Sequence, residues 1–129
     1  MNNAHILLVE PDLVLGRLYS QALERSGYGV SHAADAQSAI NAADTRRPNV
    51  VVLEMQLALH SGAAFLYEFR SYVDWVDIPV VLHTLISESR LLPYQEALNE
   101  LGVSDVLYKP EASLQSLLSV IRNRCTTVS

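Results

Sequence analysis

The stretch VVVLE at residues 50–54 decides the fold, because four consecutive apolar residues end directly at a carboxylate. A short, continuous apolar run is typical of a parallel strand that is buried on both faces. We predict further strands at 5–9, 79–82 and 104–108, and a weaker edge strand at 29–33. The sequence therefore predicts five strands, of which 50–53 is the strongest.

Segments with the period of an α-helix separate these strands. After the N-cap candidate Asp12, apolar residues recur at helical spacing up to a stop at Gly27. Further helices are predicted at 36–46, from 62 to about 72, from about 93 to 101, and from 114 onward. Five strands that alternate with five helices predict a doubly wound (βα)5 α/β fold, in which helices cover both faces of a parallel sheet.

Length and composition limit the class of protein. The 129 residues suit one domain, which we place at 1–125 with a C-terminal tail at 126–129. The net charge of −5 argues against binding to nucleic acid. The lone Cys125 excludes an internal disulfide and fits a reducing compartment, and we find no signal peptide or apolar stretch of membrane-spanning length. We therefore expect a cytoplasmic protein.

Polar side chains gather where the predicted strands end. Glu10 and Asp12 follow the first strand, and Glu54 follows the third. Thr84 follows the fourth strand and Lys109 the fifth. Parallel sheets of this kind place their chemistry beyond the carboxyl ends of the strands. We expect these five side chains to share one rim of the sheet.

Four motifs around this rim carry a family resemblance: ILLVE at 6–10, PNVVVLE at 48–54, IPVVLHT at 78–84 and GVSDVLYKP at 102–110. They are similar to the receiver domains of two-component response regulators, the family of the chemotaxis protein CheY, and the similarity runs from about His5 to Arg122. The resemblance implies a flavodoxin-like sheet of order 2-1-3-4-5. It also implies a role in two-component (phosphorelay) signalling, with a histidine kinase, a phosphotransfer protein or an output protein as partner.

The resemblance also assigns roles at the rim. In receivers, paired acids after the first strand help to hold Mg²⁺, and an aspartate that ends the third strand accepts phosphate. The hydroxyl at the position of Thr84 turns toward the phosphoryl oxygens, and the lysine at the position of Lys109 pairs with them. Phosphoryl transfer needs this arrangement because it depends on positioning and on neutralisation of charge.

Glu54 departs from the pattern, since it stands at the phosphoacceptor position. Its extra methylene moves the carboxylate outward by about 1.5 Å. A misplacement of about 1 Å can cost on the order of 100-fold in rate. We therefore expect no useful acyl phosphate on Glu54 and interpret the chain as an atypical receiver, a pseudo-receiver.

The metal site departs as well. Pro11 stands where the second acid of the pair is expected, and it carries no carboxylate. Asp12 lies one position after the place of the second acid in the family pattern. It is better explained as a helix N-cap than as a metal ligand. A Mg²⁺ site made of Glu10, Glu54 and Gln56 is expected to be weak or absent, and no other cofactor is expected.

Two further positions in the pocket differ from the family. Leu85 stands where receivers carry a small residue, and it is predicted to cover the pocket. Val106 replaces the aromatic residue that commonly switches rotamer. The remaining residues suggest a permanent ion pair between Glu54 and Lys109 that holds the domain in one conformational state. The alternative is that Lys109 only balances two acids in a relic pocket.

Three residues are candidates for interfaces. Leu13 opens the first helix, where kinases or phosphotransfer proteins dock on similar domains. Tyr94 and Tyr108 belong to the surface of helix four, strand five and helix five, which is the usual output or dimer face of the family. The chain is expected to be a monomer or a homodimer through that face.

The sequence as a whole favours a protein-interaction module of a signalling pathway without enzymatic turnover. One alternative is a conventional receiver that accepts phosphate with a weakened Mg²⁺ site. Another is a small-ligand-binding domain of flavodoxin-like fold, which is disfavoured because no Ser/Thr/Gly-rich phosphate loop follows the first strand. Direct binding of this domain to DNA is not expected, and neither is contact with a membrane.

Overall fold

Five parallel strands form a sheet of order β2-β1-β3-β4-β5 in the computed structural model, which describes residues 4–57 and 61–126. The predicted order and the predicted α/β fold are confirmed. The strands are β1 (His5–Val9), β2 (Gly29–Ala33), β3 (Val50–Leu53), β4 (Val80–Thr84) and β5 (Val103–Tyr108). β3 lies in the middle of the sheet, so the side chain that follows it is at the centre of the rim.

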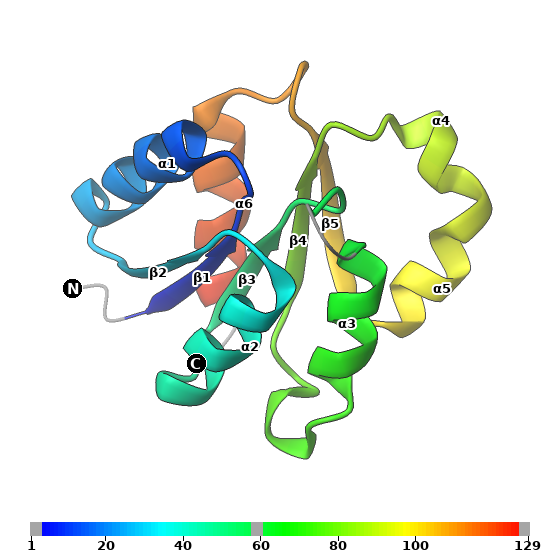
Figure 1. Cartoon of the computed structure of the whole chain (residues 1–129). Helices are drawn as coiled ribbons and strands as arrows, with labels where there is room; N and C mark the ends of the chain where they lie inside the picture. Colours follow the sequence, from blue (N-terminus) through cyan, green and yellow to red (C-terminus); the bar gives the residue numbers. More distant parts are fainter. Residues whose placement is uncertain (1–3, 58–60, 127–129) are drawn as a thin grey trace.

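Helices cover both faces of this sheet (Figure 1). α1 (Leu13–Arg25) and α6 (Leu114–Thr126) lie on one face, and α2 (Ala36–Thr45) and α3 (Gly62–Arg70) lie on the other. A short 3₁₀ turn, η1 (Val73–Trp75), follows α3. A broken helical segment stands beside β5 and consists of α4 (Glu88–Leu91), the 3₁₀ turn η2 (Leu92–Tyr94) and α5 (Gln95–Glu100).

Several predicted boundaries need correction. The fourth helix was expected from about Pro93, but the helical segment begins five residues earlier at Glu88 and changes to 3₁₀ geometry around the proline. Proline has no N–H to donate to the preceding turn, which explains the break. α3 ends at Arg70, two residues before the predicted end. α6 includes Thr126, the first residue of the predicted tail, and the rest of that tail, 127–129, lies outside the described residues.

The two ends of α1 follow the predicted signals. Asp12 is its N-cap, and its Oδ1 atom accepts hydrogen bonds from the N–H groups of Val14 at 2.9 Å and Leu15 at 3.0 Å. Gly27 has a φ of 95°, a left-handed conformation that glycine adopts without steric cost and that lets the chain turn toward β2. The side chain of Asp12 is therefore occupied by the helix that it begins.

The apolar run in β3 fills two cores at once. Val51 and Leu53 pack with α2 and α3, whereas Val50 and Val52 pack on the opposite face with α1 and α6. Alternate side chains of a strand point to opposite faces, so a strand between two layers of helices must be apolar throughout. The rigid sheet fixes the positions of the residues at its carboxyl rim. No helix within the described residues is long and apolar enough to cross a membrane.

Candidate functional site

The backbone itself fixes the residues at the rim. The N–H of Glu10 donates to the carbonyl of Ala33 at 2.9 Å, and the N–H of Glu54 donates to the carbonyl of Val9 at 3.0 Å. The N–H of Lys109 donates to the carbonyl of Thr84 at 2.8 Å. The parallel ladder thus continues one residue past β1, β3 and β5. It brings Glu10, Glu54, Thr84 and Lys109 together, as the sequence predicted.

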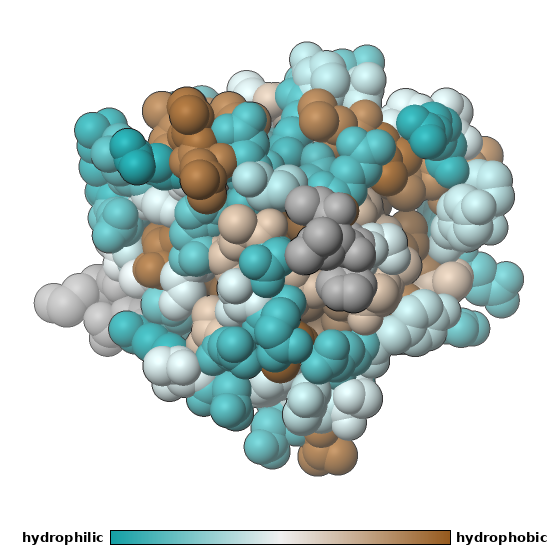
Figure 2. All heavy atoms as spheres, in the orientation of Figure 1, coloured by the Kyte–Doolittle hydropathy of each residue, from teal (hydrophilic) through white to brown (hydrophobic). Residues whose placement is uncertain are grey.

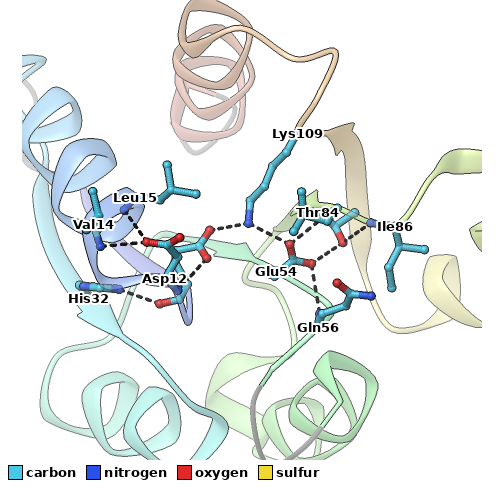
Figure 3. A network of polar contacts seen from close by, with 11 residues as sticks. Asp12, Val14, Leu15, His32, Glu54, Gln56, Thr84, Ile86 and Lys109 are labelled. Carbon is cyan, nitrogen blue, oxygen red and sulfur yellow. Dashed lines mark hydrogen bonds and ion pairs between the residues drawn. The ribbon is translucent and has the colours of Figure 1, made fainter.

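The carboxylate of Glu54 lies at the centre of this cluster (Figure 3). Its Oε2 atom accepts hydrogen bonds from the hydroxyl of Thr84 and from the N–H of Gln56, the latter at 3.1 Å. Its Oε1 atom accepts from the N–H of Leu85 at 2.9 Å and from Nζ of Lys109 at 2.8 Å. The Glu54 side chain is only 2% exposed. Four donors from three separate segments therefore hold one buried carboxylate.

Lys109, the only lysine in the sequence, links two acids. Its Nζ lies 2.5 Å from Oε1 of Glu10 and 2.8 Å from Oε1 of Glu54, and all three side chains are buried. The Glu54–Lys109 ion pair suggested by the sequence is present. Glu10 contacts the same ammonium group. The geometry therefore agrees both with a Glu54–Lys109 lock and with a lysine that balances two acids.

Hydrogen bonds keep these groups charged despite their burial. Burial on its own would raise the pKa of Glu54, but the hydrogen bonds from Lys109, Thr84 and the N–H of Gln56 lower that pKa below its usual value. Burial would lower the pKa of Lys109, but Glu10 and Glu54 raise it above its usual value. At neutral pH, the ammonium and the Glu54 carboxylate are therefore both ionised.

The oxygens that a receiver offers to Mg²⁺ already have partners here. Oε1 of Glu10 contacts Lys109, and its Oε2 accepts the N–H of Asp12 at 3.1 Å. Asp12 caps α1, and Gln56 contributes an N–H donor to the cluster. No group of three or more His, Cys, Asp or Glu side chains within the described part of the chain could hold a metal ion. The residues in this arrangement do not fit a magnesium site.

The other residues predicted for the pocket lie at its margin. The side chain of Leu85, predicted to cover the pocket, is 54% exposed, and it is the backbone N–H of this residue that contacts Glu54. Val106 is partly buried against the core and does not belong to the cluster of charges. Leu13 and Tyr94 are exposed, and Tyr108 is half-buried. Figure 2 shows hydrophobic side chains gathered over α1, where Leu13, Val14 and Leu18 are exposed.

Two histidines near the rim have roles that sequence reasoning missed. Nε2 of His32 lies 2.8 Å from the backbone carbonyl of Glu10, so β2 also supports the acid. A histidine on a buried strand such as His83 is expected to have its ring nitrogens hydrogen-bonded. It is buried and packs edge-on against Tyr19 with ring centroids 5.0 Å apart, but its Nδ1 atom has no hydrogen-bond partner among the described residues. No sequence pattern indicates either contact.

His83 should make the fold sensitive to mild acid. Burial, with a further contribution from the positive charge of Lys109, lowers the pKa of His83 from 6.5 to about 4. The unfolded chain therefore binds a proton between pH 6.5 and pH 4 that the folded chain does not bind. The free energy of unfolding should fall over this window by about 3 kcal/mol. Urea unfolding at pH 7 and pH 4 should show this loss in the wild type, and His83→Leu should lack it. An equal loss in both proteins would contradict the assignment.

The chain matches known proteins over nearly its whole length. Residues 6–122 match the family model of the response regulator receiver domain. The probable transcriptional regulatory protein TcrX of Mycobacterium tuberculosis is 39% identical over 79 residues, which are 61% of this chain and 33% of TcrX. The KDP operon transcriptional regulatory protein KdpE of Escherichia coli is 30% identical over 122 residues, which cover 93% of this chain and 52% of KdpE. The chain thus spans a third to about half of these relatives.

Solved structures agree on the fold. A sensor protein from Polaromonas sp. superposes with a TM-score of 0.87, and the match covers 98% of both chains. Its sequence identity is 20%, so this likeness concerns the fold alone.

Proposed function

Since the chain belongs to the family of response regulator receiver domains, we propose that it transmits its signal through protein–protein contacts without being phosphorylated at Glu54. It acts as a pseudo-receiver with no enzymatic turnover. Its partners are other signalling proteins of a two-component pathway, such as a histidine kinase, a phosphotransfer protein or an output protein. The relatives are named as transcriptional regulators, and control of transcription is the output that we infer for the pathway.

One observation carries this proposal: the carboxylate of Glu54 already takes up the donors that a receiver directs at a phosphoryl group. The hydroxyl of Thr84 and Nζ of Lys109 both contact it, and the N–H groups of Gln56 and Leu85 complete the set. An incoming phosphoryl group would have to displace four donors and then fit into the same buried space. The additional methylene of Glu54 supports the proposal, because it is what carries the carboxylate out to these donors.

The same contacts fix the conformation of the loop that follows β4. The N–H of Leu85 donates to Glu54, and the N–H of Ile86 donates to Oγ1 of Thr84 at 3.1 Å. This loop leads directly into α4. The cluster of Glu10, Glu54, Thr84 and Lys109 therefore holds the start of the α4–α5 segment in one position. The resulting surface is present at all times, and its signal is controlled by the amounts of the chain and its partner.

Tight binding of Mg²⁺ is not part of this function. A divalent ion would have to displace Lys109 from both Glu10 and Glu54 and would still lack the carboxylate that Pro11 does not supply. In a calorimetric titration at neutral pH, we expect no saturable heat through the low-millimolar range. Saturable, stoichiometric binding below this range would contradict the proposal.

Amide NMR spectra test directly whether the loop after β4 keeps one conformation in the presence of a phosphodonor. Acetyl phosphate with Mg²⁺ should leave the resonances of Gln56, Leu85 and Ile86 in the wild type unchanged. Glu54→Gln keeps the side-chain size but replaces one acceptor oxygen with an NH₂ group, so it should shift all three resonances. Movement of these resonances in the wild type on addition of the phosphodonor would show that the pocket still responds to phosphorylation.

A further inference from the structure

Arg70, the last residue of α3, anchors a part of the fold that lies away from the charged rim. Its Nη1 atom donates to the carbonyl of Trp75 and its Nη2 atom to the carbonyl of Ile78, both at 2.6 Å. Its Nε atom donates to the carbonyl of Leu101 at 2.7 Å, and Nη2 also lies 3.3 Å from the carbonyl oxygen of Gly102. One guanidinium therefore joins the connection before β4 to the turn between α5 and β5, at the end of the sheet opposite the rim (Figure 1).

The turn between α5 and β5 is shaped around this guanidinium. Gly102 has a φ of 79°, a left-handed conformation that favours glycine. A Cβ atom at this position would collide with Nη2 of Arg70, so the position excludes a side chain for a second reason. Leu101 caps the C-terminal end of α5, where the carbonyls carry partial negative charge. Arginine suits this end of the helix, because its planar fork of five N–H donors can reach several carbonyls at once.

The α4–α5 segment is thus held at both ends. At the α4 end, Glu54 accepts the N–H of Leu85 at 2.9 Å, and Thr84 accepts the N–H of Ile86 at 3.1 Å. At the α5 end, the guanidinium of Arg70 provides the contacts. The two anchors share no residue, and they lie at opposite ends of the sheet.

The middle of the segment is exposed. No residue of η2 is buried, and the side chains of Leu92 and Tyr94 are 66% and 63% exposed. The backbone departs from helical geometry at Tyr94, with φ −107° and ψ 7°, and Pro93 has no N–H to donate to the preceding turn. By contrast, Leu91 of α4 and Leu98 of α5 are both buried in the core. The two short helices therefore pack on the core separately, and an exposed 3₁₀ turn joins them.

We propose that η2 is a hinge between two independently anchored halves, so that a change in the cluster around Glu54 moves residues 85–92 and stops before α5. Hinges are short segments at the ends of elements that absorb changes of φ and ψ. The state of the pocket then alters the surface of α4, whereas the surface of α5 stays the same. The inference rests on the proposed function only in the role given to this cluster, because the anchor at Arg70 does not involve it.

Amide NMR spectra of two variants test whether the anchors are independent. Glu54→Gln removes an acceptor at the α4 end, so it should shift resonances between 85 and 92 and leave those between 95 and 102 unchanged. Arg70→Met removes the donors at the α5 end and should give the reverse pattern. Arg47→Met is the matched control, because Arg47 also donates to a backbone carbonyl, that of Asp74, but this hydrogen bond does not reach the turn between α5 and β5.

Hydrogen exchange gives the size of the effect. The N–H groups of Leu101 and Gly102 donate to carbonyls of α5 at 3.0 Å, so their exchange reports opening of the end of this helix. Arg70→Met should accelerate this exchange about 10- to 100-fold, as expected for the loss of hydrogen bonds to a charged group. Exchange between residues 85 and 91 should change by less than about 2-fold, as expected for sites that do not interact. Arg70→Lys keeps the charge without the fork, so its exchange should lie between that of the wild type and that of Arg70→Met.

Pro93→Ala tests the hinge itself. It restores an N–H donor and removes the proline ring, so α4 and α5 can join in one continuous helix. In the double variant of Glu54→Gln and Pro93→Ala, the shifts that begin at Leu85 should therefore extend through residues 95–102. Leu92→Ala is the matched control, since it introduces the same side chain at an exposed position of η2 but keeps the proline. Combined with Glu54→Gln, it should leave the shifts confined to α4.

Each alternative outcome has a clear meaning. Shifts that spread through α5 in Glu54→Gln alone, or confined shifts in the double variant with Pro93→Ala, would overturn the inference. Unchanged exchange at the α5 end in Arg70→Met, or equal acceleration throughout the chain, would overturn it as well. If Arg70→Met does not fold, Arg70→Lys supplies the same comparison. Failure of the proposed function is distinguishable, because a phosphodonor would then shift resonances between 85 and 92 in the wild type while those between 95 and 102 stayed unchanged.

Discussion

Replacing Lys109 with methionine is expected to lower the free energy of unfolding by about 3–5 kcal/mol, which is typical when one partner of a buried ion pair is removed. The substitution keeps much of the side-chain volume but leaves two buried carboxylates, Glu10 and Glu54, without their shared cation. Chemical denaturation at pH 7 measures the loss. Arg17→Met removes an exposed cation from α1, and this control should change stability by less than about 0.5 kcal/mol.

The pH dependence identifies the cause of that loss. In the wild type, the lowered pKa of Glu54 contributes stability that is present above the usual carboxyl pKa and is lost as the pH falls through the folded value. In Lys109→Met, the carboxylate of Glu54 loses its cation but stays buried, so its pKa should rise and its protonation in acid stabilises the variant. The difference between the two proteins should therefore shrink from pH 7 to pH 4. A variant with Glu10→Gln, Glu54→Gln and Lys109→Met should recover most of the stability; if it does not, the cost lies in packing.

The second large effect is expected from rebuilding the acceptor. Glu54→Asp withdraws the carboxylate by about 1.5 Å from Lys109 and Thr84, and Pro11→Asp supplies the missing acid. The double variant should form an acyl phosphate with acetyl phosphate and Mg²⁺ at least ~100-fold faster than the wild type, because about 1 Å of misplacement costs that much. Intact-mass spectrometry over time measures the rate. The double variant should also show the saturable Mg²⁺ heat that we do not expect from the wild type.

The single variants define what each change contributes. Glu54→Asp alone restores the space for a phosphoryl group but not the metal ligand, so it should react more slowly than the double variant. Pro11→Asp alone keeps the carboxylate of Glu54 on its four donors and should not react. If the double variant were as inert as the wild type, the length of the acceptor side chain and the missing acid would not explain the lost chemistry.

The sheet and its rim were predictable from the sequence because both depend on local patterns. A run such as Val50–Leu53 can be accommodated only between two layers of helices, and the residue that follows it must lie at the carboxyl end of the strand. The N-cap at Asp12 was likewise visible, since a carboxylate before an apolar period is a local signal. The fourth helix was placed wrongly because Pro93 was interpreted as a helix start, whereas it lies within η2 in the interior of the segment.

Contacts that depend on tertiary geometry were not predictable. Lys109 contacts both Glu54 and Glu10, as the alternative of a lysine between two acids allowed, but no pattern indicates that the contact to Glu10 is the shorter one. Arg70 hydrogen-bonds the carbonyls of Trp75, Ile78 and Leu101 at 2.6–2.7 Å, and no spacing in the sequence indicates this. The register shift between β4 and β5 at Val80 and Val81 was not predictable either, because single-residue patterns carry no information about strand pairing.

Intact mass after incubation with acetyl phosphate and Mg²⁺ tests the central claim most directly. The account predicts that the wild-type chain keeps its unmodified mass, because the carboxylate of Glu54 holds the donors that a phosphoryl group would need. A stoichiometric adduct with the mass of one phosphoryl group, labile to hydroxylamine and mapped to Glu54, would contradict it.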